Sequence, residues 1–254
     1  MTDNSDIRKM IAAPFAPVTE EPDLMSRQLD ELLYGETCVL LEETGGFAHV
    51  RTDGDVDGYV EKRHLFDVLH EPTCLVCKPF ADLLCENRDF YRPMMTLPRG
   101  SLLDAGYSRE EKKYAFAVLP SSRIWYIRQS CLRPFRKGTR EEIVSDALSY
   151  LGVQYRLGGR TPAGIDCSGL VMMAYGMNGY RLGRRPEPES AYGFEPADPK
   201  NLKPADLLYY PGHVAMYVGG GDMIHASSTA GGVVLAKADS RPGLLCALTK
   251  PDLP

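Results

Sequence analysis

The sequence predicts an α+β protein in which two small β-barrels precede a domain of helices packed on an antiparallel sheet. Three observations support this fold class. Short β-rich runs broken by turn residues fill residues 26–135, a helical pattern begins at residue 139, and strand-like runs return after residue 205. Helices followed by antiparallel strands are typical of an α+β domain. A chain of 254 residues is long enough for two or three domains that each bury a core.

The first half of the chain is predicted to contain an arm and two barrels. Residues 1–25 carry three prolines and little periodicity, so we interpret them as an N-terminal arm. Residues 26–70 alternate β-rich runs with turn clusters, which predicts a first barrel of about five strands. Residues 71–135 show a second set of the same signals and predict a second barrel. A linker is expected at residues 134–138.

The last domain is predicted to cover residues 139–254. Thr139-x-x-Glu142 is a capping-box pattern, and we expect the helix that it starts to end at Gly152. A buried helix is expected to follow Asp166 and to stop at Gly176. The apolar side chains on one face of the first helix are Ile143, Val144, Ala147, Leu148 and Leu151.

The rest of this domain is predicted to be one loop and five strands. Residues 176–204 contain five prolines and no clear period, which indicates a long surface loop. Strand-like runs follow at residues 206–210, 213–218, 222–225, 233–236 and 244–248.

The composition argues against several classes of partner. The formal net charge is −5 and charged residues of both signs are interspersed, so no nucleic-acid partner is expected. No apolar run approaches the roughly 18 residues of a membrane span, and the first residues are acidic where a signal peptide would be basic. We therefore expect no membrane partner and a cytoplasmic location. Seven cysteines without the spacing of a disulfide framework indicate reduced thiols.

Cys74-x-x-Cys77, close to His64 and His70, has the spacing of half a zinc site. A structural zinc ion needs four ligands, and no second pair follows at ordinary spacing. The alternative, two small core thiols in a strand, is favoured, and no metal is expected.

One cysteine and two histidines have the layout of a nucleophile, its base and an orienting group. Cys167 follows Asp166, a predicted N-cap, so it lies in the first turn of a helix. Unpaired amides and the helix dipole favour an anion there, and we expect the pKa of the thiol to be lowered. The same amides can stabilise an oxyanion. His213 opens a strand after Pro211-Gly212, and His225 ends the next strand.

The two histidine strands are predicted to pair as a hairpin through the glycines at residues 219–221. With symmetry about Gly220, His213 lies opposite about position 227, close to His225. We expect the imidazoles to hydrogen-bond, with His213 as the base and His225 fixing its tautomer. Taken alone, a cysteine at a helix start is more often a small buried residue, and a strand histidine is more often structural. The three residues together, in this order, favour catalysis.

Several motifs resemble those of NlpC-type cysteine peptidases. They are Tyr155-x-x-Gly158-Gly159, Asp166-Cys167-Ser168-Gly169-Leu170, and the run from Gly212 to Gly219 that contains His213. The resemblance covers about residues 139–250 and implies a papain-like catalytic domain that cuts peptidoglycan peptides. The first half resembles the paired bacterial SH3-like domains of a subgroup that hydrolyses the bond between γ-D-glutamate and meso-diaminopimelate or L-lysine.

The resemblance implies a role for each matching residue of the last domain. It implies Cys167 as the nucleophile, His213 as the base and His225 as the third, orienting residue. Tyr155 is implied to lie by the oxyanion together with the helix-start amides, including that of Cys167. Asp166 and Ser168, which flank the nucleophile, match positions that contact the stem peptide.

Two residues of the first barrel are implied in substrate binding. Leu33-Tyr34-Gly35-Glu36 resembles a segment whose glutamate binds the free amine of an N-terminal L-alanine, and Tyr59 matches an aromatic residue of the same wall. The alternative for Glu36 is a solvent-facing strand residue. Arg184 or Arg185 can meet a carboxylate of the diamino acid, although two arginines in a proline-rich loop are more often solvated.

The leading hypothesis is a cytoplasmic cysteine endopeptidase that acts on murein-derived tri- and tetrapeptides with a free N-terminal L-alanine, through a Cys-His-His triad and a thioester. No metal or organic cofactor is expected. A cell-wall-binding module is one alternative. An amidase or acyltransferase on the same cysteine–histidine scaffold is another, because acyl-enzyme chemistry is common to all of these enzymes.

Overall fold

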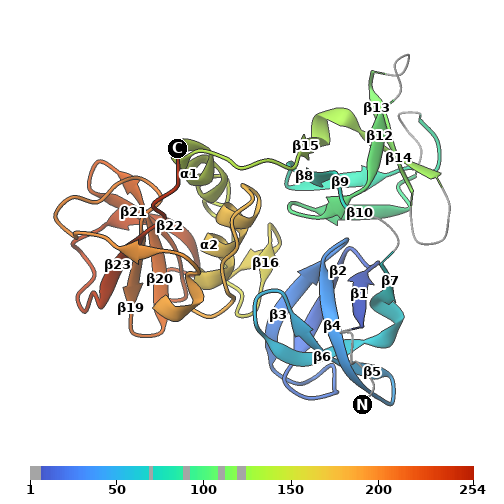
Figure 1. Cartoon of the computed structure of the whole chain (residues 1–254), viewed down its shortest axis with the longest axis horizontal. Helices are drawn as coiled ribbons and strands as arrows, with labels where there is room; N and C mark the ends of the chain where they lie inside the picture. Colours follow the sequence, from blue (N-terminus) through green and yellow to red (C-terminus); the bar gives the residue numbers. More distant parts are fainter. Residues whose placement is uncertain (1–6, 69–70, 88–91, 108–111, 119–123) are drawn as a thin grey trace. The chain divides into compact units, whose positions relative to one another are not determined.

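The computed structural model describes the chain in five stretches, residues 7–68, 71–87, 92–107, 112–118 and 124–254. The chain divides into two compact units, Met1–Phe135 and Arg136–Pro254 (Figure 1). The division lies inside the linker predicted at residues 134–138. Clusters of buried apolar side chains lie within each unit, so each unit has a core of its own.

The first barrel is a seven-stranded antiparallel sheet with the strand order β3-β2-β6-β5-β4-β1-β7. Its core contains small and β-branched side chains such as Val18, Val50 and Val60, which are fully buried. Burial alternates along β5 and β6, as expected for strands that bury one face. The elements are β1 (Arg8–Ile11), β2 (Phe15–Thr19), β3 (Gln28–Leu33), β4 (Thr37–Thr44), β5 (Phe47–Thr52), β6 (Asp57–Glu61), the 3₁₀ turn η1 (Lys62–His64) and β7 (Leu65–Asp67).

The N-terminal arm predicted for residues 1–25 is wrong for residues 8–19, because β1 and β2 belong to this sheet. β1 pairs with both β4 and β7. β2 pairs with β3 along its length but meets β6 only at Thr19. Pro17 is tolerated because most of β2 has a paired strand on one side only. Prolines that suggested an arm are therefore compatible with a strand of this kind.

The second barrel consists of three small antiparallel sheets with the orders β10-β9, β11-β8-β15 and β12-β13-β14. An isolated bridge between Leu84 and Tyr126 connects two of them. Val76, Leu97 and Ile127 are fully buried in the common core. The elements are β8 (Cys74–Val76), β9 (Phe80–Leu83), β10 (Met95–Pro98), β11 (Leu102–Leu103), β12 (Ala105–Tyr107), β13 (Tyr114–Val118), β14 (Ile124–Arg128), η2 (Gln129–Cys131) and β15 (Leu132–Pro134).

The turn before β4 contacts the second barrel within this unit. Gly35 has a φ of 82°, and a Cβ atom at this position would lie 2.2 Å from the carbonyl oxygen of Leu102. The amide of Leu102 donates a hydrogen bond to the carbonyl of Tyr34 at 2.8 Å, and the Tyr34 side chain is buried in the core of the second barrel. Glycine is required here by both the positive φ and the close backbone approach. The second barrel therefore holds the turn that carries Glu36.

The second unit has the predicted helices and an antiparallel sheet with the order β18-β23-β19-β20-β21-β22. α1 packs on α2, which in turn packs on β20 and β21 (Figure 1). The elements are α1 (Arg140–Leu148), β16 (Arg160–Thr161), β17 (Gly164–Ile165), α2 (Cys167–Gly176), η3 (Pro188–Ser190), β18 (Glu195–Pro196), β19 (Leu207–Tyr210), β20 (His213–Gly219), β21 (Asp222–Ser227), β22 (Gly232–Lys237) and β23 (Cys246–Thr249).

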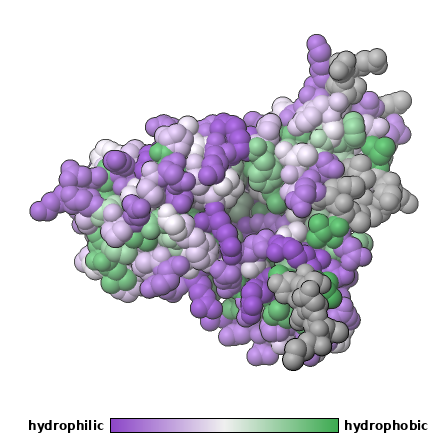
Figure 2. Space-filling view, in the orientation of Figure 1, coloured by the Kyte–Doolittle hydropathy of each residue, from purple (hydrophilic) through white to green (hydrophobic). Residues whose placement is uncertain are grey.

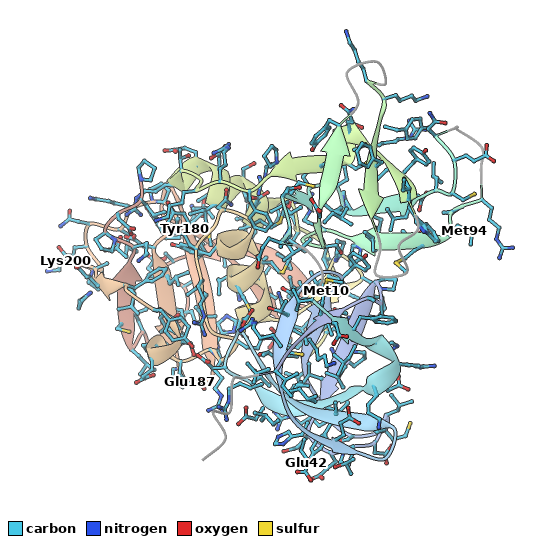
Figure 3. The ribbon with its side chains drawn as sticks, turned by 45° about the vertical axis from the view of Figure 1, so that its right-hand side comes forward. Met10, Glu42, Met94, Tyr180, Glu187 and Lys200 are labelled. Carbon is cyan, nitrogen blue, oxygen red and sulfur yellow. The ribbon has the colours of Figure 1, made fainter. Side chains whose placement is uncertain are left out.

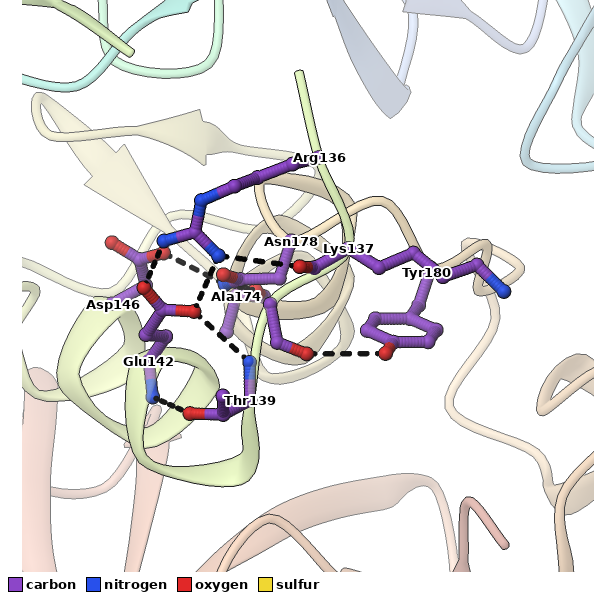
Figure 4. Close-up of polar contacts among 9 residues, drawn as sticks. Arg136, Lys137, Thr139, Glu142, Asp146, Ala174, Asn178 and Tyr180 are labelled. Atoms are coloured by element: carbon purple, nitrogen blue, oxygen red, sulfur yellow. Dashed lines mark hydrogen bonds and ion pairs between the residues drawn. The ribbon is translucent and has the colours of Figure 1, made fainter. Parts of the chain in front are cut away.

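α1 begins with the predicted capping box (Figure 4). The amide of Glu142 donates to Oγ1 of Thr139 at 3.4 Å, and the amide of Thr139 donates to Oε2 of Glu142 at 3.0 Å. Asn178 donates to the Asp146 carboxylate at 2.8 Å and so joins α1 to the residues that follow α2. The helix ends at Leu148 rather than at Gly152, because a turn intervenes, and this turn leaves Leu151 exposed.

α2 begins and ends where predicted. The N-cap is Asp166, whose Oδ1 accepts a hydrogen bond from the amide of Gly169 at 2.8 Å. Most of the side chains of this helix are buried, including that of Tyr175. A helix that is apolar on most sides is expected to lie inside a domain. The first turn of α2 is therefore shielded from solvent.

The segment between α2 and β19 is only in part the surface loop predicted for residues 176–204, because residues 177–184 are mostly buried whereas residues 185–204 are mostly exposed or half-buried. Tyr180, Glu187 and Lys200 mark its course in Figure 3. Tyr180 and Arg184 are buried, and the Tyr180 hydroxyl donates to the carbonyl of Gly138 at 3.1 Å (Figure 4). Prolines prevent regular structure in this segment, but they do not prevent burial.

The visible surface is mixed in character. Figure 2 shows hydrophilic side chains over much of the face that is drawn, with hydrophobic ones in smaller groups. Single exposed apolar side chains such as Met25 and Leu245 are ordinary for a folded protein. Within the stretches that the structure describes, no helix combines the length and the apolar character needed to cross a membrane.

Candidate active site

Cys167 is the first residue of α2, and only 6% of it is exposed. Hydrogen bonds from the backbone of Val214, in β20, and of Ser168 reach its sulfur. The first turn of α2 and the first residues of β20 therefore both contact the thiol of Cys167. Amides gathered in this way can also stabilise an oxyanion that forms next to the sulfur.

The expectation that the helix start lowers the pKa of Cys167 is wrong. Burial raises the pKa of this thiol, and the negative charge of Asp166 raises it further. The two backbone hydrogen bonds and Arg184 lower the pKa without cancelling that rise. The helix dipole favours the thiolate, but burial and the charge of the cap outweigh it. The thiol is protonated at neutral pH, and it needs a base to become a thiolate.

A tight hairpin between β19 and β20 places His213. Pro211-Gly212 forms its turn, and Tyr210 lies opposite His213. Gly212 has a φ of 62°, which suits the position after proline in a two-residue turn. The turn at Pro211-Gly212 therefore makes His213 the first residue of β20.

β20 and β21 pair with the register that the sequence predicted. Met216 lies opposite Ile224, so continuing this register places Ala215 opposite His225 and His213 opposite Ser227. Side chains alternate along a strand, so His213 and Ala215 share one face. Both histidines consequently project from the same face of the sheet.

The two histidines form the predicted pair. Nε2 of His213 lies 3.0 Å from Nδ1 of His225, and the rings are nearly perpendicular. This contact leaves Nδ1 of His213 available for the thiol proton. The base role expected of His213 needs a lone pair on that atom, and the tautomer in which Nε2–H of His213 donates to His225 provides it.

Both imidazoles are neutral at neutral pH. Burial lowers the pKa of His213 to about 4, and the charges of Arg241 and His225 contribute. Burial, followed by the charge of Arg241, also lowers the pKa of His225. A neutral imidazole can accept the proton of a thiol that comes within hydrogen-bond reach of it.

Tyr155 lies close enough to the nucleophile to interact with it electrostatically. Its backbone bridges to Ile165, just before the N-cap, and its amide donates to the carbonyl of Gly231 at 2.8 Å. Burial raises the pKa of its hydroxyl, and Cys167 and Asp166 contribute to that rise. The hydroxyl keeps its proton at neutral pH and can donate a hydrogen bond to a nearby oxyanion.

Asp166 and Ser168 are both buried, and Arg184 joins them. Arg184 donates to the two carboxylate oxygens of Asp166 at 2.8 and 2.7 Å and to Oγ of Ser168 at 2.6 Å. The amide of Gly158 also donates to Asp166 at 2.8 Å. A bidentate arginine–carboxylate pair fixes both groups in orientation as well as in charge. Of the two arginines of the loop, Arg184 is therefore engaged inside the domain, and Arg185 is exposed.

The sequence-predicted residues lie in both units. Cys167, His213, His225, Tyr155, Asp166 and Ser168 belong to the second unit. Glu36 and Tyr59 belong to the first. Glu36 is half-buried, and its Oε2 accepts a hydrogen bond from the amide of Leu33 at 2.8 Å. Tyr59 stacks on His49 with the ring centroids 4.9 Å apart.

No metal centre is found among the described residues, in which no three His, Cys, Asp or Glu side chains gather as ligands. Cys74 is buried in the core of the second barrel, and Cys77 is half-buried. His70 lies outside the described residues. A pocket of about 660 Å³ in the second unit, bordered by Leu202, Tyr217 and Lys237, has none of the catalytic residues in its lining.

The surroundings of two arginines, Arg184 and Arg241, were not predicted from the sequence. Arg184 was considered for the substrate, and its pairing with Asp166 was not foreseen. Arg241 belongs to no motif, yet its guanidinium lies 5.2 Å from the centroid of the Tyr210 ring. No local pattern could have found it, because this position depends on how the loop after β22 folds back over β19.

Known proteins resemble this chain over the catalytic domain and over most of its length. A profile of the NlpC/P60 family matches residues 152–242. The chain is 33% identical over 236 residues to Dipeptidyl-peptidase 6 of Lysinibacillus sphaericus, an alignment that covers 86% of this chain and 87% of that protein. It is 35% identical over 115 residues to Gamma-D-glutamyl-L-lysine dipeptidyl-peptidase of Bacillus subtilis, which covers 41% of this chain and 38% of the relative.

A solved structure shares the fold of the whole chain. The crystal structure of an NlpC/P60 family protein from Bacillus cereus matches with a TM-score of 0.85 and 18% identity, and the match covers 97% of this chain and 100% of that one. This likeness confirms the predicted fold class, two small SH3-like barrels followed by a papain-like domain.

Proposed function

The chain belongs to the NlpC/P60 family and is a cysteine peptidase, and we propose that it hydrolyses the bond between γ-D-glutamate and the diamino acid of murein stem peptides. Its substrates are tri- and tetrapeptides with a free N-terminal L-alanine and with meso-diaminopimelate or L-lysine in the third position. The name of the relative from Bacillus subtilis specifies a γ-D-glutamyl-L-lysine bond and supports this choice. The same domain with similar motifs favours the same type of bond here.

The contact between His213 and His225 carries the proposal for the reaction. Their 3.0 Å separation holds His213 as a base with Nδ1 free. Nδ1 takes the proton of Cys167 while the sulfur attacks the γ-carbonyl carbon. The tetrahedral intermediate collapses to a thioester when His213 gives that proton to the leaving amine of the diamino acid. Water then attacks the thioester with His213 again as the base, and L-alanyl-D-glutamate leaves.

The negative oxygen of the tetrahedral intermediate needs donors. The amides at the start of α2 and the protonated hydroxyl of Tyr155 are the proposed donors. Removal of one such donor typically lowers kcat by about 10²–10³-fold. Asp166 and Ser168 shape the wall beside the nucleophile, where Arg184 keeps both of them oriented.

Glu36 and Tyr59 are the proposed binders of the free L-alanine end. The hydrogen bond from the amide of Leu33 holds the Glu36 carboxylate in one orientation. An ammonium group forms a charge-assisted hydrogen bond with such a carboxylate, whereas an acylated amine carries no charge to match it. We therefore expect the enzyme to prefer peptides that have already been released from the glycan chain.

The first test uses the purified full chain with L-Ala-γ-D-Glu-meso-diaminopimelate. We expect release of free diaminopimelate, detected by mass spectrometry, and no release with the C167A variant. Cleavage at any other bond would contradict the proposed specificity, and hydrolysis that persists in C167A would contradict the nucleophile.

The second test compares this peptide with its N-acetylated form. The wild-type enzyme should cleave the free amine form faster by about 10-fold or more, the range expected for one charged hydrogen bond. E36Q keeps an oxygen for the amide of Leu33 but loses the charge, so it should lose this preference. A preference that is unchanged in E36Q would remove Glu36 from the proposal and leave the cleavage chemistry untouched.

A further inference from the structure

Arg241 lies beside the histidine pair on the loop that follows β22. Its guanidinium stands over the Tyr210 ring at 5.2 Å, and the Tyr210 ring lies 6.2 Å from the ring of His213. Tyr210 is almost completely buried, and its hydroxyl donates to the carbonyl of Ala238 at 3.4 Å, which ties it to the start of the same loop. The side chain over which Arg241 stands is therefore held in place next to the catalytic base.

The guanidinium of Arg241 is open to solvent while it stands over the Tyr210 ring. Arg241 is exposed, and within the described part of the chain its guanidinium makes no hydrogen bond or ion pair. Its charge nevertheless reaches both His213 and His225, whose pKa values it helps to lower. Arg184 is the opposite case, because Asp166 and Ser168 occupy its donors. Arg241 is thus a cation close enough to the histidine pair to act on it electrostatically, with its donors open to a ligand.

We propose that Arg241 binds a free carboxylate on a residue that flanks the scissile bond. The inference rests on the proposed function. A γ-glutamyl linkage leaves the α-carboxylate of D-glutamate free, and a stem tripeptide ends in the carboxylate of the diamino acid. Meso-diaminopimelate adds a third carboxylate on its side chain. Each is an anion close to the bond that is cut, and a guanidinium recognises a carboxylate through paired hydrogen bonds.

This role gives Arg241 a part in substrate specificity, in addition to the effect of its charge on the pKa values of the histidines. A peptide that presents a neutral amide in place of the recognised carboxylate leaves the guanidinium without an ionic partner. Such a substrate should bind less well to the wild type and should not distinguish the wild type from a variant that lacks the charge. The carboxylate that Arg241 contacts can therefore be identified by amidating each one in turn.

The experiment measures kcat/KM of the full-length enzyme on L-Ala-γ-D-Glu-meso-diaminopimelate and on three versions, each with one carboxylate converted to a carboxamide. The wild type, R241Q and R241K are compared, with R181Q as the matched control. Arg181 is also exposed and also stands over a tyrosine ring, that of Tyr192, at 4.9 Å. Thermal melts of each variant verify folding before the kinetics.

We expect R241Q to lower kcat/KM on the unmodified peptide by about 10- to 100-fold, with R241K retaining part of the activity and R181Q all of it. The loss should disappear on one of the three amidated peptides, and that peptide identifies the carboxylate. An equal loss on all four peptides, or no loss on any, would overturn the proposal. If the wild type cleaves none of the peptides, the proposed function fails, and that result is distinct from either outcome.

Discussion

Two arginines lie near the candidate catalytic residues of the second unit. They differ in whether an acidic side chain pairs with their charge. Arg184 is buried and donates to Asp166 and Ser168 on either side of the nucleophile. Arg241 is exposed over Tyr210, next to the histidine pair, and acts on both imidazoles through its charge alone. One arginine builds the wall of the site, and the other faces the solvent from which the substrate arrives. Burial and the presence of an acid, rather than the residue type, decide between these roles.

The largest effect is expected when Arg184 is replaced. R184M leaves the Asp166 carboxylate buried without its partner, and breaking a buried pair in this way costs about 3–5 kcal/mol. Urea unfolding should show a loss of that size, whereas R181M, at an exposed position in the same loop, should stay within about 0.5 kcal/mol of the wild type. The double variant D166N/R184M should recover part of the loss, because no unpaired charge remains. An R184M protein as stable as the wild type would contradict the structural role of the buried Arg184–Asp166 pair.

The next effect concerns the pH dependence of stability. His213 has a folded pKa of about 4, below its ordinary value of 6.5. Between these two values the unfolded chain binds a proton at this position and the folded chain does not. The free energy of unfolding should therefore fall as the pH drops from 6.5 to 4, by about 3 kcal/mol from this residue.

The measurement is urea unfolding at pH 7 and at pH 4.5 for the wild type and for H213N, which cannot titrate. The other groups contribute equally to both proteins, so H213N should lose less stability between these two pH values. An equal loss in both proteins would mean that His213 does not carry this pH dependence.

The smallest effect on stability, and the one that defines the second arginine, is expected for R241M. Arg241 has no buried partner, so this variant should unfold within about 0.5 kcal/mol of the wild type. Arg241 lowers the pKa values of both histidines, so its removal should raise them. The acid limb of the kcat/KM profile should then move to higher pH. A profile that does not move would contradict an influence of Arg241 on the pKa of the histidines.

Much of the catalytic framework follows from short stretches of sequence. The helix start at Cys167 depends on Asp166 as a cap, and the start of β20 at His213 depends on the Pro211-Gly212 turn. Gly219, the last residue of β20, and the two glycines between β20 and β21 set the register that brings His225 to His213. Each of these features involves residues close together in the chain, where caps and turns have recognisable residue types.

The predictions from the sequence were wrong where contacts between residues far apart in the chain determine the structure or a pKa. β1 and β2 were interpreted as an arm because prolines signal loops, and only the pairing of β1 with β4 and β7 makes them part of a barrel. The thiol of Cys167 was expected to be acidic because of the helix dipole, and burial reversed the direction of its pKa shift.

The sequence by itself therefore determined the candidate catalytic residues, Cys167, His213 and His225, and the fold that carries them. Only the tertiary structure decided that the thiol rests protonated, that Arg184 is paired with Asp166 and that Arg241 stands beside the histidines. The physical reason is that protonation and the availability of a charge depend on desolvation and on partners brought together by folding, which no local pattern records.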